Sequence, residues 1–259
     1  MRLVCLGDLL LDVIVRLDQP LVPGDDQVAV TRTGAGGQAA NVAVWARELG
    51  AEARFVGRRG DDAAGELVAR ELAERGVEVA GPVGGWTGVV PSLASDGDRT
   101  MASDRGAAVD LDPRELEPAW FDCDVLHLSG YSLLREPVAS AAVRAAQLAR
   151  EQGALVSVDV STWTLVDDAF RARVREVAPD VVFATEREQE VLGPVETRWV
   201  VKRGAAGLRV DGVDYPAVET DAIDTTGAGD AFAAGFLVGG PQLGLEAAAR
   251  CCAQLGSMP

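Results

Sequence analysis

The sequence predicts an α/β protein whose central sheet is mostly parallel and covered by helices on both faces. Short apolar runs alternate with amphipathic helical stretches along the 259 residues, which is the pattern of repeated strand–helix–strand units. The runs carry few polar residues, as strands buried on both faces do. Two segments alternate polar and apolar residues instead, which predicts additional half-exposed strands.

The expected elements follow in order along the chain. Helices are expected at 37–49, 62–75, 136–152, 167–176, 186–191, 229–238 and 243–256, the first two ended by Gly50 and Gly76. Apolar strands are expected at 2–7, 53–57, 124–128, 154–158, 180–183, 197–202, 207–210 and 213–216. Alternation marks 11–17 and 27–33, and a hairpin is expected at 87–94 and 99–103 around the turn composition Ser95-Asp-Gly-Asp98. The alternating regions, about 11–33 and 87–103, could pair into a small separate sheet.

Bulk properties limit the classes of function. The length fits one large α/β domain over 1–259. A net charge of −16 argues against nucleic acid and against anionic membrane as partners. An acid follows the first residues too soon for a signal peptide, so a cytoplasmic location is expected. The single histidine, His127, and the absence of a Gly-x-Ser-x-Gly motif oppose a Ser-His-Asp hydrolase.

The most informative segment is Asp224-Thr-Thr-Gly-Ala-Gly-Asp230, which directly precedes an apolar helical run. Free N–H groups at a helix start bind anions, and the small residues Gly227, Ala228 and Gly229 let a ligand approach this backbone. A carboxylate at the same place would repel a phosphate. Asp230 is therefore expected to act as a base that takes a proton from a hydroxyl, while the N–H groups hold a transferring phosphoryl group.

This string, continued by Ala-Phe232, resembles the C-terminal signature of the ribokinase-like (PfkB) carbohydrate kinases. The resemblance implies an α/β/α sandwich with a small β-sheet lid over the sugar site, and the lid often forms a dimer surface. It also implies ATP-dependent phosphorylation of a sugar hydroxyl with Mg²⁺. Asp224 and Thr226 resemble positions that hold a monovalent cation such as K⁺ in many members.

The second glycine cluster, Gly34-Ala-Gly36-Gly37-Gln-Ala-Ala-Asn41, has two interpretations. Gly34-x-Gly36-x-x-Ala39 nearly fits a dinucleotide fingerprint. The cluster also resembles the Gly-Gly-x-x-x-Asn sugar-binding element of the same kinase family. The fingerprint requires a preceding buried strand, whereas this cluster follows a half-exposed one. The sugar element is therefore favoured, with Gly36, Gly37 and Asn41 at the substrate.

Two further positions are expected on the substrate side. Gly7-Asp8-Leu-Leu-Leu-Asp12 resembles the opening motif of the family, and by that match Asp12 hydrogen-bonds substrate hydroxyls. Arg99 or Arg105 is expected to reach a substrate phosphate or carboxylate. The competing interpretation is a surface arginine paired with the neighbouring Asp98 or Asp104.

The nucleotide side combines one match with two departures. Val200-Val-Lys202-Arg-Gly204-Ala-Ala-Gly207 resembles the nucleotide-phosphate loop, which implies that Lys202, Gly204 and Gly207 bind ATP. Thr185 is expected at the same ATP site. Thr185-Glu-Arg-Glu188 replaces the usual Asn-x-x-Glu, and Glu188 would organise water around Mg²⁺. Asp159-Val-Ser161 lacks the usual central proline. These departures put the efficiency of Mg·ATP handling in question.

Three alternatives remain beside a sugar kinase. A nucleoside kinase of the same family would share every motif named above. A dinucleotide-dependent oxidoreductase would use the Gly34–Asn41 turn, and a non-catalytic sugar-binding protein would account for Thr185. The intact Asp230 argues against the last of these.

Overall fold

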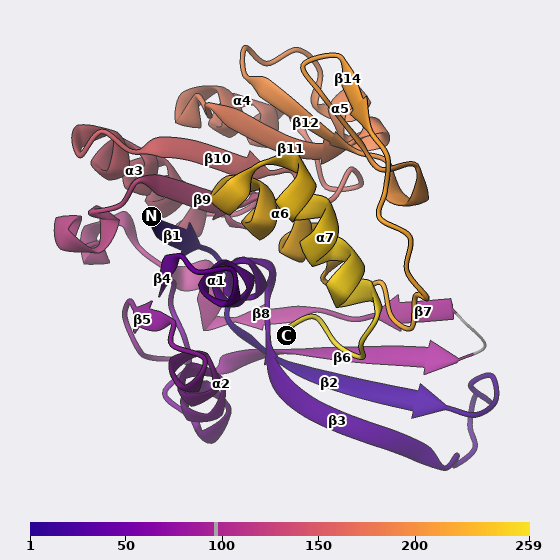
Figure 1. The fold of residues 1–259 in the computed structure, drawn as a ribbon. Helices are drawn as coiled ribbons and strands as arrows, with labels where there is room; N and C mark the ends of the chain where they lie inside the picture. Colours follow the sequence, from indigo (N-terminus) through magenta and orange to yellow (C-terminus); the bar gives the residue numbers. More distant parts are fainter. Residues whose placement is uncertain (96–97) are drawn as a thin grey trace.

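The computed structural model describes residues 1–95 and 98–259, with residues 94, 95, 98 and 99 described by their backbone alone. Within these residues, a nine-stranded sheet forms the body (Figure 1). In this sheet, β1, β4, β5 and β9 to β12 run parallel to one another, whereas β13 is antiparallel to both of its neighbours, β12 and β14. Their spatial order is β14 (Val213–Tyr215), β13 (Leu208–Val210), β12 (Arg198–Lys202), β11 (Val181–Thr185), β10 (Leu155–Asp159), β9 (Val125–Ser129), β1 (Arg2–Leu6), β4 (Glu52–Val56) and β5 (Glu78–Ala80).

Helices cover both faces of this sheet, and a separate apolar core fills each interface. One core is contributed by α1 (Gln38–Glu48), α2 (Ala63–Glu74), α6 (Ala228–Gly239) and α7 (Pro241–Cys252). The other is contributed by α3 (Val138–Glu151), α4 (Asp168–Val177) and α5 (Glu186–Leu192). Short 3₁₀ helices are η1 (Ala107–Asp110), η2 (Pro113–Glu115), η3 (Pro118–Phe121), η4 (Gly130–Leu133) and η5 (Gly204–Ala206). The predicted doubly covered α/β architecture is confirmed.

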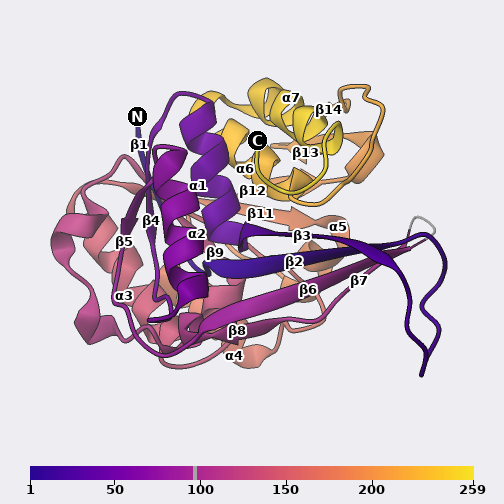
Figure 2. The same cartoon turned by 90° about the horizontal axis from the view of Figure 1, so that it is seen from below.

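A second sheet projects from the body, as Figure 2 shows, and is called the lid here. Its strands are β3 (Ala29–Gly36), β2 (Leu10–Leu17), β6 (Thr87–Ser95), β7 (Asp98–Met101) and β8 (Asp104–Gly106). The parallel pairing of β2 with β6 joins the two alternating segments of the sequence. The predicted small sheet is therefore confirmed.

Some elements differ from the expectations. The glycines Gly34 and Gly36 belong to β3, so this strand runs up to the start of α1. The strands β5 and β8 were not predicted, because three residues are too few to show a period. The predicted turn residues 96–97 lie outside the described residues.

The topology gathers strand ends where a ligand can bind. In open α/β sheets, ligands bind beyond the carboxyl ends of the parallel strands. Here β9 ends at Ser129, β10 at Asp159, β11 at Thr185 and β12 at Lys202, and Asp8 closely follows β1. Within the described residues, none of the helices is both long and apolar enough to cross a membrane.

The buried histidine on β9 generates a stability prediction. His127 is fully buried, and burial lowers its pKa to about 4. The unfolded chain therefore binds a proton between pH 6.5 and pH 4 that the folded protein does not, so acidification through this range destabilises the fold. The difference in unfolding free energy between the wild type and His127→Gln should fall by about 2 kcal/mol from pH 7.5 to pH 5 in urea titrations. A difference independent of pH would contradict this account.

Candidate active site

The predicted anion site lies at the start of α6. Gly227 is the N-cap residue with a φ of 76°, and a Cβ there would lie 2.6 Å from the Ser257 Cβ, so both conformation and packing require glycine. Ala228, Gly229 and Asp230 form the first turn. The first N–H groups of a helix lack acceptors within it, although that of Ala228 lies 3.3 Å from the Thr225 carbonyl oxygen.

Asp230 is the residue of this site that can accept a proton from a substrate hydroxyl. Its Oδ2 accepts a hydrogen bond from Asn41 Nδ2 at 2.7 Å, and the Gln38 amide also favours the charged form of the carboxylate. Asp230 is partly buried, and the loss of hydration is the largest influence that raises its pKa to about 7, with a further increase from the Asp159 carboxylate. The two amides and the Lys202 ammonium act in the opposite direction. A carboxylate that titrates near neutrality suits a general base.

The substrate-side residues meet where the lid joins α1. Asp12 on β2 pairs with Gly34 on β3, and a Cβ on Gly36 would lie 2.2 Å from the Asp12 carboxyl carbon. Gly36 is therefore needed to admit this carboxylate. Gly37 is the N-cap residue of α1, and Asn41 lies in the first turns of the same helix.

Arg105 is held by a partner that sequence analysis did not foresee. Its guanidinium donates twice to the Asp8 carboxylate, from Nε and from Nη2, both at 2.6 Å. It also lies over the Tyr131 ring, 5.9 Å from the centroid. The pair fastens β8 to the end of β1, so the expected pairing with a neighbouring acid is wrong for the described residues. Arg99 lies outside the residues whose side chains are described.

Lys202 is placed beside the start of α6. Its Nζ donates to Asp159 Oδ2 at 2.6 Å, and a Cβ on Gly229 would lie 3.7 Å from this nitrogen. Burial opposes the charge, but the carboxylates of Asp159 and Glu188 outweigh it and raise the pKa of Lys202. The ammonium therefore stays charged next to the anion site.

The departure at Thr185 has a local structural explanation. The Thr185 hydroxyl accepts from the Glu188 N–H at 3.2 Å, and Glu188 Oε2 accepts from the Thr185 N–H at 2.7 Å. This reciprocal capping box begins α5. Glu188 is only 6% exposed and still acts electrostatically on Lys202. Its buried carboxylate has the oxygen chemistry that hydrated Mg²⁺ prefers.

A cavity of about 1100 Å³ adjoins the same helix start. It lies between the loop after β12, the segment 216–225, α6 and α7. Its volume is sufficient for a nucleotide. The lining includes Lys202, Gly204, Gly207, Leu208, Pro216, Val218, Thr225, Ala228, Gly229, Phe232, Leu245 and Cys252.

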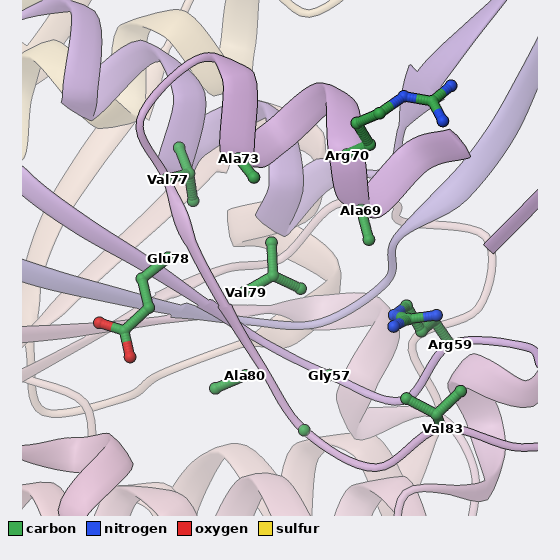
Figure 3. A pocket seen from close by; sticks show the side chains of 11 residues that line it. Gly57, Arg59, Ala69, Arg70, Ala73, Val77, Glu78, Val79, Ala80 and Val83 are labelled. Carbon is green, nitrogen blue, oxygen red and sulfur yellow. The ribbon is translucent and has the colours of Figure 1, made fainter. Parts of the chain in front are cut away.

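A second cavity of about 400 Å³ lies elsewhere, between α2 and β5 (Figure 3). Its lining is mostly small and apolar, and its charged residues are Arg59, Arg70 and Glu78. It contains none of the predicted site residues. The larger cavity is therefore the one associated with the predicted phosphate chemistry.

Asp224 and Thr226 support the loop that leads into α6. Asp224 Oδ1 accepts from the Thr226 N–H at 2.9 Å and from its hydroxyl at 2.6 Å. Asp224 Oδ2 accepts from the Gly256 N–H at 3.1 Å. These contacts fix the loop against the C-terminal segment, and the binding of a cation there stays a prediction.

Several residues near Asp230 were missed from the sequence. Gln38 lies three residues before Asn41 on α1, a spacing that places both on one helix face and could have revealed it. Ser129, Ser161 and Ser257 contact these two amides. Ser161 lies in the segment Asp159-Val-Ser161 that the sequence analysis names, whereas the isolated Ser129 and Ser257 carry no comparable sequence signal.

Comparison with known proteins agrees with this geometry. The model of the pfkB family carbohydrate kinases matches residues 1–258. The ATP-dependent ribose-1-phosphate kinase of Halopiger xanaduensis is 32% identical over 256 residues, which cover 91% of this chain and 83% of the relative. Fructokinase-1 of Oryza sativa is 32% identical over 234 residues, which cover 78% of this chain and 72% of the relative. The adenosine kinase structure from Sinorhizobium meliloti has a TM-score of 0.86 at 26% identity, and the match covers 100% of this chain and 95% of that structure's chain.

The chain belongs to the pfkB family of carbohydrate kinases. This membership confirms the predicted family, the ribokinase-like fold and the class of enzyme, an ATP-dependent carbohydrate kinase. The glycine cluster at Gly34–Asn41 lies where a lid strand meets α1, away from the first strand of a βαβ unit. The location thus favours the sugar element over a dinucleotide fingerprint.

The buried ion pair of Lys202 can be tested by substitution. Asp159 is 1% exposed, so Lys202→Met leaves a buried carboxylate without its cation and should cost about 3 kcal/mol of unfolding free energy in urea. The double variant Lys202→Met/Asp159→Asn should recover a large part of this loss. As a control, Arg144→Met removes an exposed pair with Glu151 and should cost less than about 1 kcal/mol. Equal losses in the two single variants would contradict the buried-pair account.

Proposed function

We propose that Asp230 takes the proton from a sugar hydroxyl while the N–H groups at the start of α6 stabilise the phosphoryl group arriving from ATP. One observation carries this proposal. The carboxylate occupies the first turn of a glycine-rich helix start, and burial raises its pKa to about 7. A base and an anion site thus share one turn, which suits phosphoryl transfer to a hydroxyl.

The large cavity is proposed to hold ATP. Lys202 lies on its wall next to Gly229, where a positive charge would balance the phosphates. Gly204 and Gly207 line the same cavity, and Thr185 begins the neighbouring helix. Bound Mg²⁺, organised through water on Glu188, would supply charge neutralisation for the phosphate oxygens.

The substrate is proposed to be a sugar that lies under the lid. Asp12 would accept hydrogen bonds from adjacent hydroxyls, which suits a polyol. Gly36 and Gly37 let substrate approach the backbone beside it, and Asn41 offers an amide next to Asp230. Arg105, whose guanidinium is held by Asp8, is proposed to reach a phosphate or carboxylate of the substrate. Relatives named as fructokinase and ribose-1-phosphate kinase support a sugar, and the adenosine kinase neighbour makes nucleosides the principal alternative.

The assignment of Asp230 predicts a specific loss of turnover. ADP release from Mg·ATP should be stimulated by one class in a panel of sugars, sugar phosphates, sugar acids and nucleosides. Asp230→Asn removes the base and should lower kcat by about 10²–10⁴-fold with KM values for both substrates nearly unchanged. Asp168→Asn changes an exposed carboxylate of α4 and should leave turnover intact. Unchanged turnover in Asp230→Asn would overturn the mechanism.

A monovalent cation at Asp224 and Thr226 predicts dependence on the salt used. A cation there would add positive charge close to the start of α6 and favour the phosphoryl group. Turnover should therefore be several-fold higher in KCl than in tetramethylammonium chloride at equal ionic strength, and Asp224→Asn should remove the difference. Equal rates in the two salts would contradict the cation site.

A homodimer through the lid is proposed from the pattern of its strands. Val15 on β2 faces Leu93 on β6, and Val13 faces Pro91, on the side of the sheet opposite to Asp12. A second copy would cover this apolar side. Light scattering should give twice the chain mass for the wild type and a lower mass for Val13→Lys/Val15→Lys. A monomeric wild type at assay concentration would exclude the dimer.

A further inference from the structure

The Asn41 side chain is held at both ends of its amide. Its Nδ2 donates to Asp230 Oδ2 at 2.7 Å, and its Oδ1 accepts from the Ser257 hydroxyl at 3.0 Å. An ionised carboxylate can only accept hydrogen bonds, so the amide nitrogen must face Asp230 and the amide oxygen must face Ser257. The Ser257 hydroxyl, which could otherwise donate or accept, is thereby required to donate. Asn41 and Ser257 are each 6% exposed, so water has little access to replace this contact.

The backbone around Ser257 is fixed from two directions. The indole N–H of Trp45, which is fully buried, donates to the Ser257 carbonyl oxygen at 2.8 Å. Trp45 lies four residues after Asn41 on α1, so one face of this helix binds both the carbonyl and the hydroxyl of Ser257. The preceding N–H, that of Gly256, donates to Asp224 Oδ2 at 3.1 Å. The direction of the Ser257 hydroxyl is therefore defined by the surrounding structure.

Ser257 also packs against the helix start that forms the predicted anion site. A Cβ on Gly227 would lie 2.6 Å from the Ser257 Cβ. Gly227 is the N-cap residue of α6, and Asp230 lies in the first turn of the same helix. One serine in the segment after α7 thus contacts the anion site directly and the carboxylate through Asn41.

We propose that Ser257 is a positioning residue that anchors the Asn41 amide and, through it, aims the Asp230 carboxylate at the substrate hydroxyl. The inference rests on the proposed role of Asp230 as the base. Without the hydroxyl, the buried Asn41 oxygen would lose its donor, and the amide would be free to rotate. The carboxylate would then lose both its fixed orientation and a donor to its charged form.

A single substitution isolates the hydroxyl. Ser257→Ala keeps the Cβ that packs against Gly227, so the anion site should be preserved. At pH 9, where the carboxylate is ionised, kcat should fall about three- to tenfold while the KM for ATP stays within about twofold of wild type. Ser140→Ala removes an exposed hydroxyl that donates to Glu136 and should leave kcat unchanged. A raised KM for ATP with an unchanged kcat would place the effect at the anion site and overturn the inference.

A double-mutant cycle distinguishes action through Asn41 from a general structural effect. Asn41→Leu removes the amide and should lower kcat by more than Ser257→Ala does. If Ser257 acts only through the amide, adding Ser257→Ala to Asn41→Leu should change kcat by less than about twofold. Losses that multiply would show that Ser257 acts elsewhere, which contradicts the inference.

The pH profile of kcat/KM reports on the carboxylate itself. The hydrogen bond from Asn41 favours the charged form of Asp230 and lowers its pKa. The acid limb should therefore move to higher pH by about 0.5–1 unit in Asn41→Leu. Ser257→Ala leaves the amide in place without its anchor and should move the limb in the same direction by about half as much. An unshifted limb in Ser257→Ala would count against the inference.

Other charged and titratable groups also face Asp230, and the substitutions leave all of them in place. The Asp159 carboxylate on β10 raises the pKa of Asp230, and the Lys202 ammonium on β12 lowers it. The remaining groups within electrostatic reach are Tyr131 from η4, Cys5 from β1 and Cys251 from α7, with Glu188 from α5 acting on both Lys202 and Tyr131. Burial raises the pKa of Cys251, the nearest of these to Ser257, to about 12, so this thiol stays neutral throughout the profile.

The outcomes separate the inference from the proposed function. If Asp230→Asn is inactive while Ser257→Ala shows neither the loss at pH 9 nor the shifted limb, only the inference fails. If Asp230→Asn retains turnover, the proposed base fails, and the ¹³C titration of the Asp230 carboxyl carbon, which needs no turnover, decides whether Ser257 controls the carboxylate. A midpoint that rises in Ser257→Ala and not in Ser140→Ala supports this control, whereas equal midpoints in the wild type and both variants refute it.

Discussion

The partial burial of one carboxylate between two helix starts is the constraint on which the site depends. Asp230 lies in the first turn of α6, and the Asn41 amide from the start of α1 donates to it. Burial of a carboxylate in a protein interior is costly unless hydrogen bonds satisfy it. The cost is offset here only in part, and the remainder appears as a pKa near 7. The loss of hydration at Asp230 therefore destabilises the fold locally and also raises the proton affinity of this carboxylate, which allows it to act as a base near neutral pH.

The surrounding structure serves this arrangement from several directions. The C-terminal segment contributes Ser257, which fixes Asn41 and packs against Gly227. The carboxyl ends of β9 and β10 contribute the hydroxyls and the carboxylate that surround Gln38 and Lys202. The lid begins at the same place, because β3 runs directly into α1. A substrate held by Asp12 on the lid is therefore brought toward the helix that positions the base.

The sequence predicts most of the fold because its patterns are local and strong. Apolar strands and glycine-ended helices can be recognised within a few residues, and the nine residues from Asp224 to Phe232 mark the start of α6. The strands β5 and β8 escape such patterns because each has three residues. The pairing of Arg105 with Asp8 spans 97 positions and has no local signal, and the contacts of Gln38 with Ser129 and Ser161 are equally remote. The candidate site is thus predicted as a set of motifs, and the network that tunes it becomes visible only in three dimensions.

The central claim is that the Asp230 carboxyl group titrates near neutrality in the folded protein. The most direct measurement is the ¹³C chemical shift of aspartate carboxyl carbons as a function of pH, with Asp230→Asn used to assign the resonance. The account predicts a titration near pH 7 for this carbon. A midpoint close to the ordinary aspartate value of about 4 would contradict it.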